Sequence, residues 1–359
     1  MRKSFQSFTV ALTVVAAAFN FFAYEINEFN ANLRVFVTKG KWHIRVFDDR
    51  GLPISRSARM EKDFVSPFYV VHYGLFYSDS CFERDWTGRY HWREDPTMAF
   101  WNVPPIIATK KRFQYAADWV VKNLKTDAMG NAHLYYNFDW AYKNAPGGKL
   151  AAPWWSGLTE GHALTLLLRA SDCFDDPVYD AAASDLYKSV LTPVSEGGSL
   201  LTMNGYPWIE EYVDPNLPEH SLSRVFNGMV YAYHGVRAYE IARGGRNMAD
   251  ALEEAIIKNV SEFSHSDHWS YYDAIGTSAN IKYHRINLAL IEDDRLRQSA
   301  ELQNIADDWR LGVRHSGFFY VLFGENSISK LHFILAFFLT VTLGFGCIRG
   351  VLAQIRKVK

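Results

Sequence analysis

Four side chains able to carry protons stand out in this sequence: Glu211 and Tyr212 are adjacent, and Tyr272 and Tyr283 follow downstream. A carboxylate beside a phenol, with two further phenols, suits removal of a weakly acidic C–H proton next to a carboxylate. That chemistry needs a base on one face of the carbon and, for inversion, an acid on the other. It also needs cations or strong donors where the enolate charge develops. Tyrosine serves either role when its neighbours lower its pKa from about 10.

Each of these residues also has a plainer interpretation. Glu211 could pair with a surface arginine while Tyr212 packs in the core. Residues 282–285, Lys-Tyr-His-Arg, form a cationic cluster around a phenol. Such a cluster could stabilise a phenolate and clamp a carboxylate, or it could be an exposed basic patch at the start of a helix. The aromatic pair at 271–272 could be core or a sugar-stacking platform.

Other catalytic signatures are missing from the sequence. No phosphate-binding glycine loop, nucleophile elbow or metal-ligand spacing appears. We therefore expect no metal and no cofactor. The isolated histidines are interpreted as packing or polar-groove residues; they are His133, His162, His220 and His234.

The composition limits the class of partner. The 359 residues carry a formal charge of −1, so no global field attracts a polyanion, and nucleic acid is excluded as an expected partner. Aromatic residues make up 16% of the chain, which indicates either a crowded core or a groove that stacks on sugar rings. Three cysteines are too few for a disulfide framework; Cys81 and Cys173 are either paired after export or packed as free thiols, and Cys347 lies in an apolar tail.

Both ends of the chain predict contact with a lipid bilayer. Residues 5–24 carry no charged side chain and follow Arg2 and Lys3, as in a signal peptide or an uncleaved anchor. Residues 331–348 are long and apolar enough to span a bilayer, and basic residues follow them. The positive-inside rule then puts the C-terminus in the cytosol and the intervening residues in a periplasmic or lumenal space.

Between these ends the pattern predicts a mainly α fold. Alternating residues at 32–37 and 42–47, followed by 52–54, predict a short β segment. Apolar periodicity from about residue 64 predicts helical hairpins, which would form an α/α toroid with a groove at one end if they closed into a ring. We expect four parts: an N-terminal signal or anchor (1–24), a β-rich segment (25–63), a helical catalytic domain (64–328) and a membrane helix with a basic tail (329–359). The helical windows are 113–124, 158–168, 179–191, 225–242, 249–263 and 299–309.

An ordered series of motifs resembles the C-terminal domain of the D-glucuronyl C5-epimerase family. Residues 154–163, WWSGLTEGHA, are similar to its tryptophan-rich W-x-S-G-x-x-Q-G pattern. The resemblance covers about residues 100–312. It continues in family order through residues 167–170, 197–198, 208–212, 225–229, 269–273 and 283–284, and Trp309.

The resemblance implies a toroid, usually dimeric, that converts D-glucuronate to L-iduronate within a heparan-type polysaccharide. It implies acid–base roles for Glu211, Tyr212, Tyr272 and Tyr283, with Tyr212 on one sugar face and Tyr272 or Tyr283 on the other. The groove-shaping candidates are Trp154, Trp155, Asn227 and His284, and the candidate cations for the substrate carboxylate are Arg224, Lys282 and Arg285.

The sequence departs from the family pattern at three places. Glu160 replaces a glutamine, which predicts a change in the charge of the groove. An arginine that some members carry after the tyrosine-aspartate pair is missing, and Asn287 replaces a second histidine. A polysaccharide lyase and a non-catalytic glycan-binding protein therefore stay open as alternatives. The expected partners are an acidic polysaccharide, a lipid bilayer and a second copy of the chain.

Overall fold

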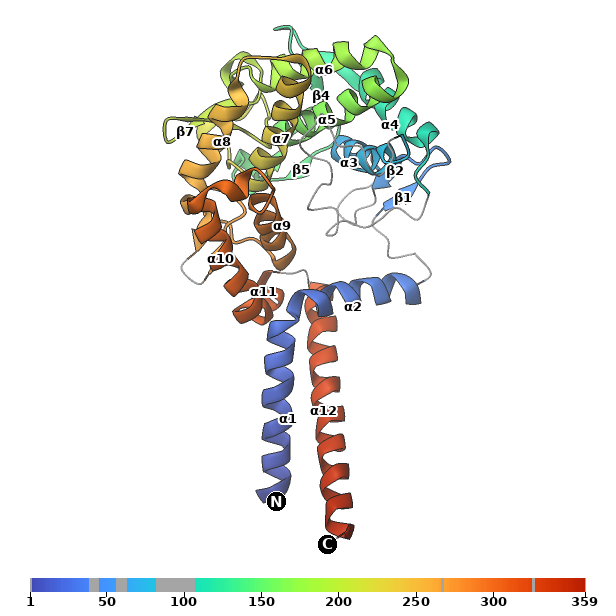
Figure 1. Cartoon of the computed structure of the whole chain (residues 1–359), viewed down its shortest axis with the longest axis vertical. Coiled ribbons are helices and arrows are strands. Elements are labelled where there is room, and N and C mark those ends of the chain that lie inside the picture. Colours follow the sequence, from blue (N-terminus) through green and yellow to red (C-terminus); the bar gives the residue numbers. More distant parts are fainter. Residues whose placement is uncertain are drawn as a thin grey trace.

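The computed structural model describes residues 2–38, 45–55, 63–81, 107–265, 268–324 and 327–358. Over these residues the chain is mostly helical, with short two-stranded sheets in the connections (Figure 1). The helices are α1 (Arg2–Phe21), α2 (Ala23–Val37), α3 (Pro67–Ser78), α4 (Lys110–Asn123), α5 (Gly157–Phe174), α6 (Pro177–Val190), α7 (Phe226–Arg243), α8 (Met248–Asn259), α9 (Ile281–Ile291), α10 (Ala300–His315), α11 (Gly317–Gly324) and α12 (Ser327–Val358). The strands are β1 (Arg45–Phe47), β2 (Pro53–Ser55), β3 (Leu124–Thr126), β4 (Ala132–Leu134), β5 (Trp140–Ala141), β6 (Lys149–Leu150), β7 (Leu200–Met203), β8 (Tyr206–Ile209), β9 (Ser264–His265) and β10 (Trp269–Ser270).

Over the residues that the structure describes, four pairs of helices build the head of the molecule. They are α3–α4, α5–α6, α7–α8 and α9–α10, and within each hairpin the two helices pack together. The first helices of the hairpins also pack in sequence order, α3 on α5, α5 on α7 and α7 on α9. The prediction of helical hairpins is confirmed, and α3, α5, α7 and α9 form an inner layer.

Within the inner layer α5 and α7 pack closely, because glycines, which have no side chain, lie where the two helices cross. A Cβ on Gly161 would lie 2.5 Å from the Cα of Ala232, and one on Gly235 would lie 1.7 Å from the carbonyl oxygen of Gly161. Neither substitution fits without moving a helix. The two backbones therefore pack directly, and α5 is buried from Gly157 to Ser171.

Side-chain caps fix where the inner helices begin. The Ser156 hydroxyl accepts a hydrogen bond from the Thr159 amide, and the Asn280 side chain accepts one from the Tyr283 amide. Pro67 occupies the first turn of α3, where a missing N–H has no cost. These caps place Thr159 and Tyr283 in the first turns of α5 and α9.

The predicted strand at residues 32–37 is wrong, because these residues belong to helix α2. Phe29, Leu33 and Phe36 recur at the spacing of one helix face, and six residues were too short a window to distinguish this from alternation. The strands predicted nearby are shorter than expected: β1 and β2 pair antiparallel, with Val46 opposite Ile54. Residues 42–44 lie outside the described part of the chain.

Helices α1 and α12 run side by side away from the head, with both termini at the far end (Figure 1). Phe19 of α1 packs edge-on against Phe333 and Phe337 of α12, with ring centroids 5.3 Å apart in both pairs. Residues 328–355 of α12 are long and apolar enough to cross a membrane. Residues 5–21 pass the same test only together with residues 23–34, across a bend of 83°.

Candidate active site

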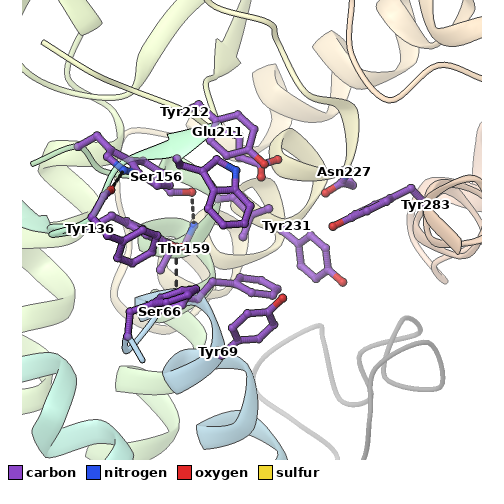
Figure 2. Close-up of a pocket in the computed structure, with 16 residues that line it drawn as sticks. Ser66, Tyr69, Tyr136, Ser156, Thr159, Glu211, Tyr212, Asn227, Tyr231 and Tyr283 are labelled. Atoms are coloured by element: carbon purple, nitrogen blue, oxygen red, sulfur yellow. Dashed lines mark hydrogen bonds between the residues drawn. The ribbon is translucent and has the colours of Figure 1, made fainter. Parts of the chain in front are cut away.

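The first turns of all four inner helices line one pocket, which we call the central pocket (Figure 2). They contribute Phe68 and Tyr69 from α3, Thr159 from α5, Asn227 from α7 and Tyr283 from α9. Further lining comes from Tyr231 in the second turn of α7 and from the loops around residues 136–140, 154–156 and 211–212. This convergence corresponds to the groove expected at one end of the hairpins.

Tyr136 joins two of these first turns. Its hydroxyl accepts a hydrogen bond from the Phe68 amide at 3.2 Å and lies 2.7 Å from the Thr159 hydroxyl. Its ring stacks on Trp154 with centroids 4.0 Å apart. Trp154 therefore lies in the pocket wall, where the sequence placed it, and its position is set by Tyr136.

A buried carboxylate, Glu210, holds the loop that carries the candidate acid–base residues. One of its oxygens accepts the amides of Glu211 and Tyr212 at 3.0 and 3.2 Å, and the other accepts the Arg224 amide at 2.8 Å. Burial raises the pKa of Glu210 to about 7, although these three donors oppose the rise. Sequence reasoning missed this role, because a glutamate that binds only backbone has no characteristic partner in the sequence.

Glu211 turns its carboxyl group into the pocket beside Asn227 and Tyr231 (Figure 2). Burial raises its pKa to about 8, helped by the charge of Glu210 and opposed by the hydroxyls of Tyr212 and Tyr272. A Cβ on Gly228 would lie 2.6 Å from one of its carboxylate oxygens. The glycine of the Phe-Asn-Gly motif therefore makes room for this carboxyl group against α7.

Three tyrosines gather at Glu211. The hydroxyls of Tyr212 and Tyr272 are 2.9 Å apart and share a hydrogen bond. The ring of Tyr283 packs edge-on against Tyr272, with centroids 5.0 Å apart. Burial, followed by the charge of Glu211, raises the pKa of Tyr212 and Tyr272 well above the usual value, which is the opposite of the lowering expected from the sequence. The four predicted acid–base residues thus lie together, although Tyr283 is far from Glu211 in the sequence.

Several residues expected in the groove lie elsewhere. His284 is fully buried, stacks on Trp269 at 3.8 Å and bonds to Ser270 and the Trp309 carbonyl. Trp155 is buried against His133, at 4.2 Å between ring centroids. Both are core residues, so their assignment to the groove wall is not supported by their positions.

The candidate cations do not line the central pocket either. Arg285 points toward α2, where its guanidinium lies 3.3 Å from Glu25 and 4.2 Å from the Tyr24 ring centroid. Burial raises the pKa of Glu28, which is also in α2, and the charge of Lys282 opposes this rise. Arg224 donates to the Leu222 carbonyl. Helix geometry explains the first two, because residues 282 and 285 lie on a different face of α9 from Tyr283.

Glu160 is also in the core, so the expected change in groove charge is wrong. Its carboxylate lies 3.0 Å from His133 Nδ1 and accepts the Leu134 amide at 3.0 Å. Burial opposes the charge on His133, but the Glu160 carboxylate raises the pKa of the imidazole overall. Asn287 is buried as well and donates to Ser270 and to the Tyr271 carbonyl.

Two further cavities adjoin the central pocket and share lining residues with it. One, the Lys143 cavity, shares Trp140 and Tyr212 with it and also contains Tyr272 and Asp273. The other, the Lys125 cavity, shares Phe64 and Phe138 with it. Sequence reasoning missed Lys143, since a lone exposed lysine on a loop carries no pattern. Among the described residues no group of three or more metal-ligating side chains is present.

A helical domain that brings a carboxyl group and three phenols together, at a central pocket and the cavity beside it, is of a class suited to acid–base chemistry on a bound ligand. The family model for the D-glucuronyl C5-epimerase C-terminus matches residues 130–310, which include this pocket's acid–base residues. The chain belongs to this family.

Individual relatives are distant. The chain is 26% identical to the D-glucuronyl C5-epimerase of Caenorhabditis elegans over 226 residues, which are 55% of this chain and 34% of that protein. It is 26% identical over 158 residues to an uncharacterized protein of Methanocaldococcus jannaschii, covering 42% of this chain and 48% of that one. The chain thus spans about a third and about half of these relatives. The solved structure of a GH8 endo-β-1,4-glucanase from an Achatina fulica gut metagenomic library aligns with a TM-score of 0.39 and 16% identity. The alignment covers 56% of this chain and 64% of that one, and it is too distant to support a conclusion.

Proposed function

We propose that this protein is a uronyl C5-epimerase that converts D-glucuronate to L-iduronate within an acidic polysaccharide of the heparosan type. The observation that carries the proposal is the cluster of Glu211, Tyr212, Tyr272 and Tyr283 at the convergent ends of the inner helices. Family membership supports the reaction class. The reaction breaks the C5–H bond on one sugar face and forms a new one on the other.

Tyr212 and Tyr272 act in this proposal as one proton-transfer unit. Their hydroxyls, 2.9 Å apart, leave no room for a sugar carbon between them, so they cannot serve opposite faces in this arrangement. Ionised Glu211 would draw a proton from this pair and let it accept the C5 proton. Tyr283, which enters from α9, would then deliver a proton to the opposite face (Figure 2). The reverse reaction uses the same groups in exchanged roles.

The negative charge of the enolate needs stabilisation that the central pocket supplies through helix ends. Four helices of the described chain begin at the pocket, and each N-terminus carries a partial positive charge from the helix dipole. Lys143 supplies a full charge in the adjoining cavity, where it opposes the rise that burial causes in the pKa of Asp273. We assign Lys143 to the uronate carboxylate or a neighbouring acidic sugar, in place of Arg224, Lys282 and Arg285.

A polymeric substrate is supported by three neighbouring cavities, because the central pocket shares lining residues with each of the other two. Aromatic residues stand at both junctions: Phe64 and Phe138 on one side, Trp140 and Tyr212 on the other. Such rings suit the apolar faces of successive sugars, and the Lys143 and Lys125 cavities each add a lysine for an anionic chain.

The hairpins support an α/α toroid over residues 64–328, carried on a membrane anchor made by α1 and α12. Basic residues cluster at the far ends of both helices, so the positive-inside rule puts the head in the periplasm or lumen. A disulfide between Cys81 and Cys173 fits that oxidising side. Asn20 bonds to the carbonyls of Arg314 and His315, which favours an anchor that is retained rather than cleaved.

The decisive experiment incubates the full chain, in detergent or nanodiscs, with heparosan in deuterated water. Deuterium at C5 of glucuronate with unchanged polymer length is the expected result. Ultraviolet-absorbing unsaturated ends would instead identify a polysaccharide lyase. Binding of the polymer without exchange or cleavage would identify a glycan-binding protein and overturn the proposal. A Tyr212→Phe Tyr272→Phe double variant is the control for contaminating activity.

A further inference from the structure

Helix α2 exposes an apolar face, which is unusual for a helix in contact with water. Phe29, Leu33 and Phe36 recur at intervals of four and three residues, so they share one face, and Phe29 and Phe36 are 65% and 81% exposed. The opposite face carries Ala23, Tyr24 and Asn27, which are buried, and Asn30, which is half-buried. In water the hydrophobic effect disfavours the exposure of the face formed by Phe29, Leu33 and Phe36.

The helix also lies at a particular level of the molecule. The chain bends by 83° between α1 and α2, so α2 runs across the two long helices where they meet the head (Figure 1). Helix α11 packs against α2 at the same level and exposes Phe319 and Phe323 one helical turn apart. We name these five residues, Phe29, Leu33, Phe36, Phe319 and Phe323, the apolar collar.

We propose that the apolar collar binds the surface of a lipid bilayer, with α2 lying in the headgroup and acyl boundary. This inference rests on the proposed crossing of that bilayer by α1 and α12. If those helices run along the membrane normal, a helix bent by 83° from α1 lies in the membrane plane. A helix in that plane with an apolar exposed face has the character of an interfacial helix.

The lipid surface explains the collar better than a second copy of the chain. The exposed apolar side chains come from two helices that both adjoin the proposed membrane helices, and Phe21 and Phe22 are exposed at the bend itself. Phe and Leu are typical of the apolar face that an interfacial helix buries at the headgroup and acyl boundary. The collar therefore continues a lipid-facing surface that begins on α1.

Helix α2 is linked to the central pocket through its contacts with α9 and α10. Glu25 binds both Arg285 of α9 and Arg314 of α10 at 3.3 Å, and Tyr24 lies under the Arg285 guanidinium. Helix α9 presents Tyr283 to the central pocket. A bilayer-bound α2 would thus fix the height and tilt of the pocket above the membrane, which suits a polymer presented at the membrane surface.

Depth-dependent quenching tests the collar. The full chain, with Cys347→Ser and the disulfide intact, receives single cysteines labelled with an environment-sensitive fluorophore at Phe36, Leu339 or Met129. The proteins are reconstituted in phosphatidylcholine bilayers carrying bromine near the carbonyl end or the middle of the acyl chains. Leu339 lies in α12, and Met129 is a 68% exposed residue of the head.

We expect blue-shifted emission at position 36 and strongest quenching there by shallow bromine, with deep bromine most effective at 339 and neither effective at 129. If the label at position 339 is quenched while the label at position 36 behaves like that at position 129, the proposal that the collar binds lipid is overturned and the proposed crossing by α12 is supported. If 36 is quenched but 339 is not, the crossing by α12 fails and the surface helix stands. Emission at 36 that is blue-shifted in detergent, unquenched by bromine and concentration-dependent would assign the collar to a second copy instead.

Discussion

Two short runs of residues behave in opposite ways in this molecule. Residues 210–212 lie in the loop after strand β8, where the neighbours Glu211 and Tyr212 both enter the pocket and Glu210 binds the backbone amides of the loop outside it. Residues 282–285 lie in the first turns of α9, and their side chains diverge. Tyr283 reaches the pocket, His284 enters the core, and Arg285 binds α2.

The difference shows why a compact motif need not be a compact site. On a helix each residue turns by about 100°, so four neighbours cannot face one ligand. The sequence cluster Lys-Tyr-His-Arg looked like a phenol inside a ring of cations. In the structure these residues divide between the pocket wall, the core and the contact with α2.

The largest expected effect separates the two sides of α9. Tyr283→Phe should lower C5 hydrogen exchange by about 100- to 10,000-fold, because a positioned proton donor or acceptor contributes that much. Arg285→Ala should leave the exchange rate near that of the unmodified protein, since Arg285 faces α2. Both rates are measured by deuterium incorporation into heparosan. Equal losses in the two variants would contradict the division of α9.

The next effect separates the two glutamates of the loop. Glu210→Ala should lower the free energy of unfolding by about 3 kcal/mol, because three backbone amides lose their acceptor at about 1 kcal/mol each. Glu211→Gln removes a buried carboxyl group that supports no backbone amide, so it should cost little or stabilise. Chemical denaturation of the full chain in detergent compares them; a larger loss in Glu211→Gln would reverse the assigned roles.

The raised pKa of Glu211 predicts a pH dependence of unusual sign. Between about 4.5 and about 8 the folded protein keeps a proton on Glu211 that the unfolded chain has lost. The unfolded state then binds fewer protons, so stability falls as pH rises through this window. Glu211→Gln should make this slope shallower. Unfolding curves at several pH values test it, and parallel slopes in the two proteins would rule the shift out.

The same titration should govern activity. If ionised Glu211 drives the tyrosine pair, C5 exchange should rise with pH toward about 8 and then level off, and Glu211→Gln should lose this rise. Exchange rates over a pH series provide the measurement, with substrate binding followed at each pH as the control. An unchanged profile in the variant would remove Glu211 from the proton relay.

The smallest expected effect is a loss of stability when the contact between Arg285 of α9 and helix α2 is removed. Arg285→Ala should cost about 1 kcal/mol of stability, since it removes a part-exposed ion pair and a cation–π contact. Glu25→Gln should cost a similar amount, because it removes the ion pairs with Arg285 and Arg314 but leaves the contact of Tyr24 with Arg285. Thermal unfolding in detergent at low and high salt would show the ionic part, and a loss of several kcal/mol would mean that α2 is essential to the head.

The sequence predicted the helical hairpins well because their apolar periodicity extends over ten or more residues. It also predicted Glu211, Tyr212, Tyr272 and Tyr283 as a group, and the structure brings them together. It failed at residues 32–37, where an exposed apolar helix face imitates the alternation of a strand. Glu210 and Lys143 were invisible because their roles depend on backbone amides and on cavities formed between distant loops.

The attachment of Asn20 has a practical consequence for handling the protein. Its side chain spans α10 and α11, donating to the Arg314 and His315 carbonyls and accepting from the Phe318 amide. Ala23 packs so closely on Gly317 that a Cβ there would lie 2.9 Å away. Trimming the chain at residue 25 to obtain a soluble fragment would strip these contacts and uncover Ile281 and Tyr320, which belong to the same apolar cluster as α1. Aggregation of such a fragment would therefore reflect the apolar surface uncovered by the truncation and not instability of the helical domain. Purification should begin with the intact polypeptide.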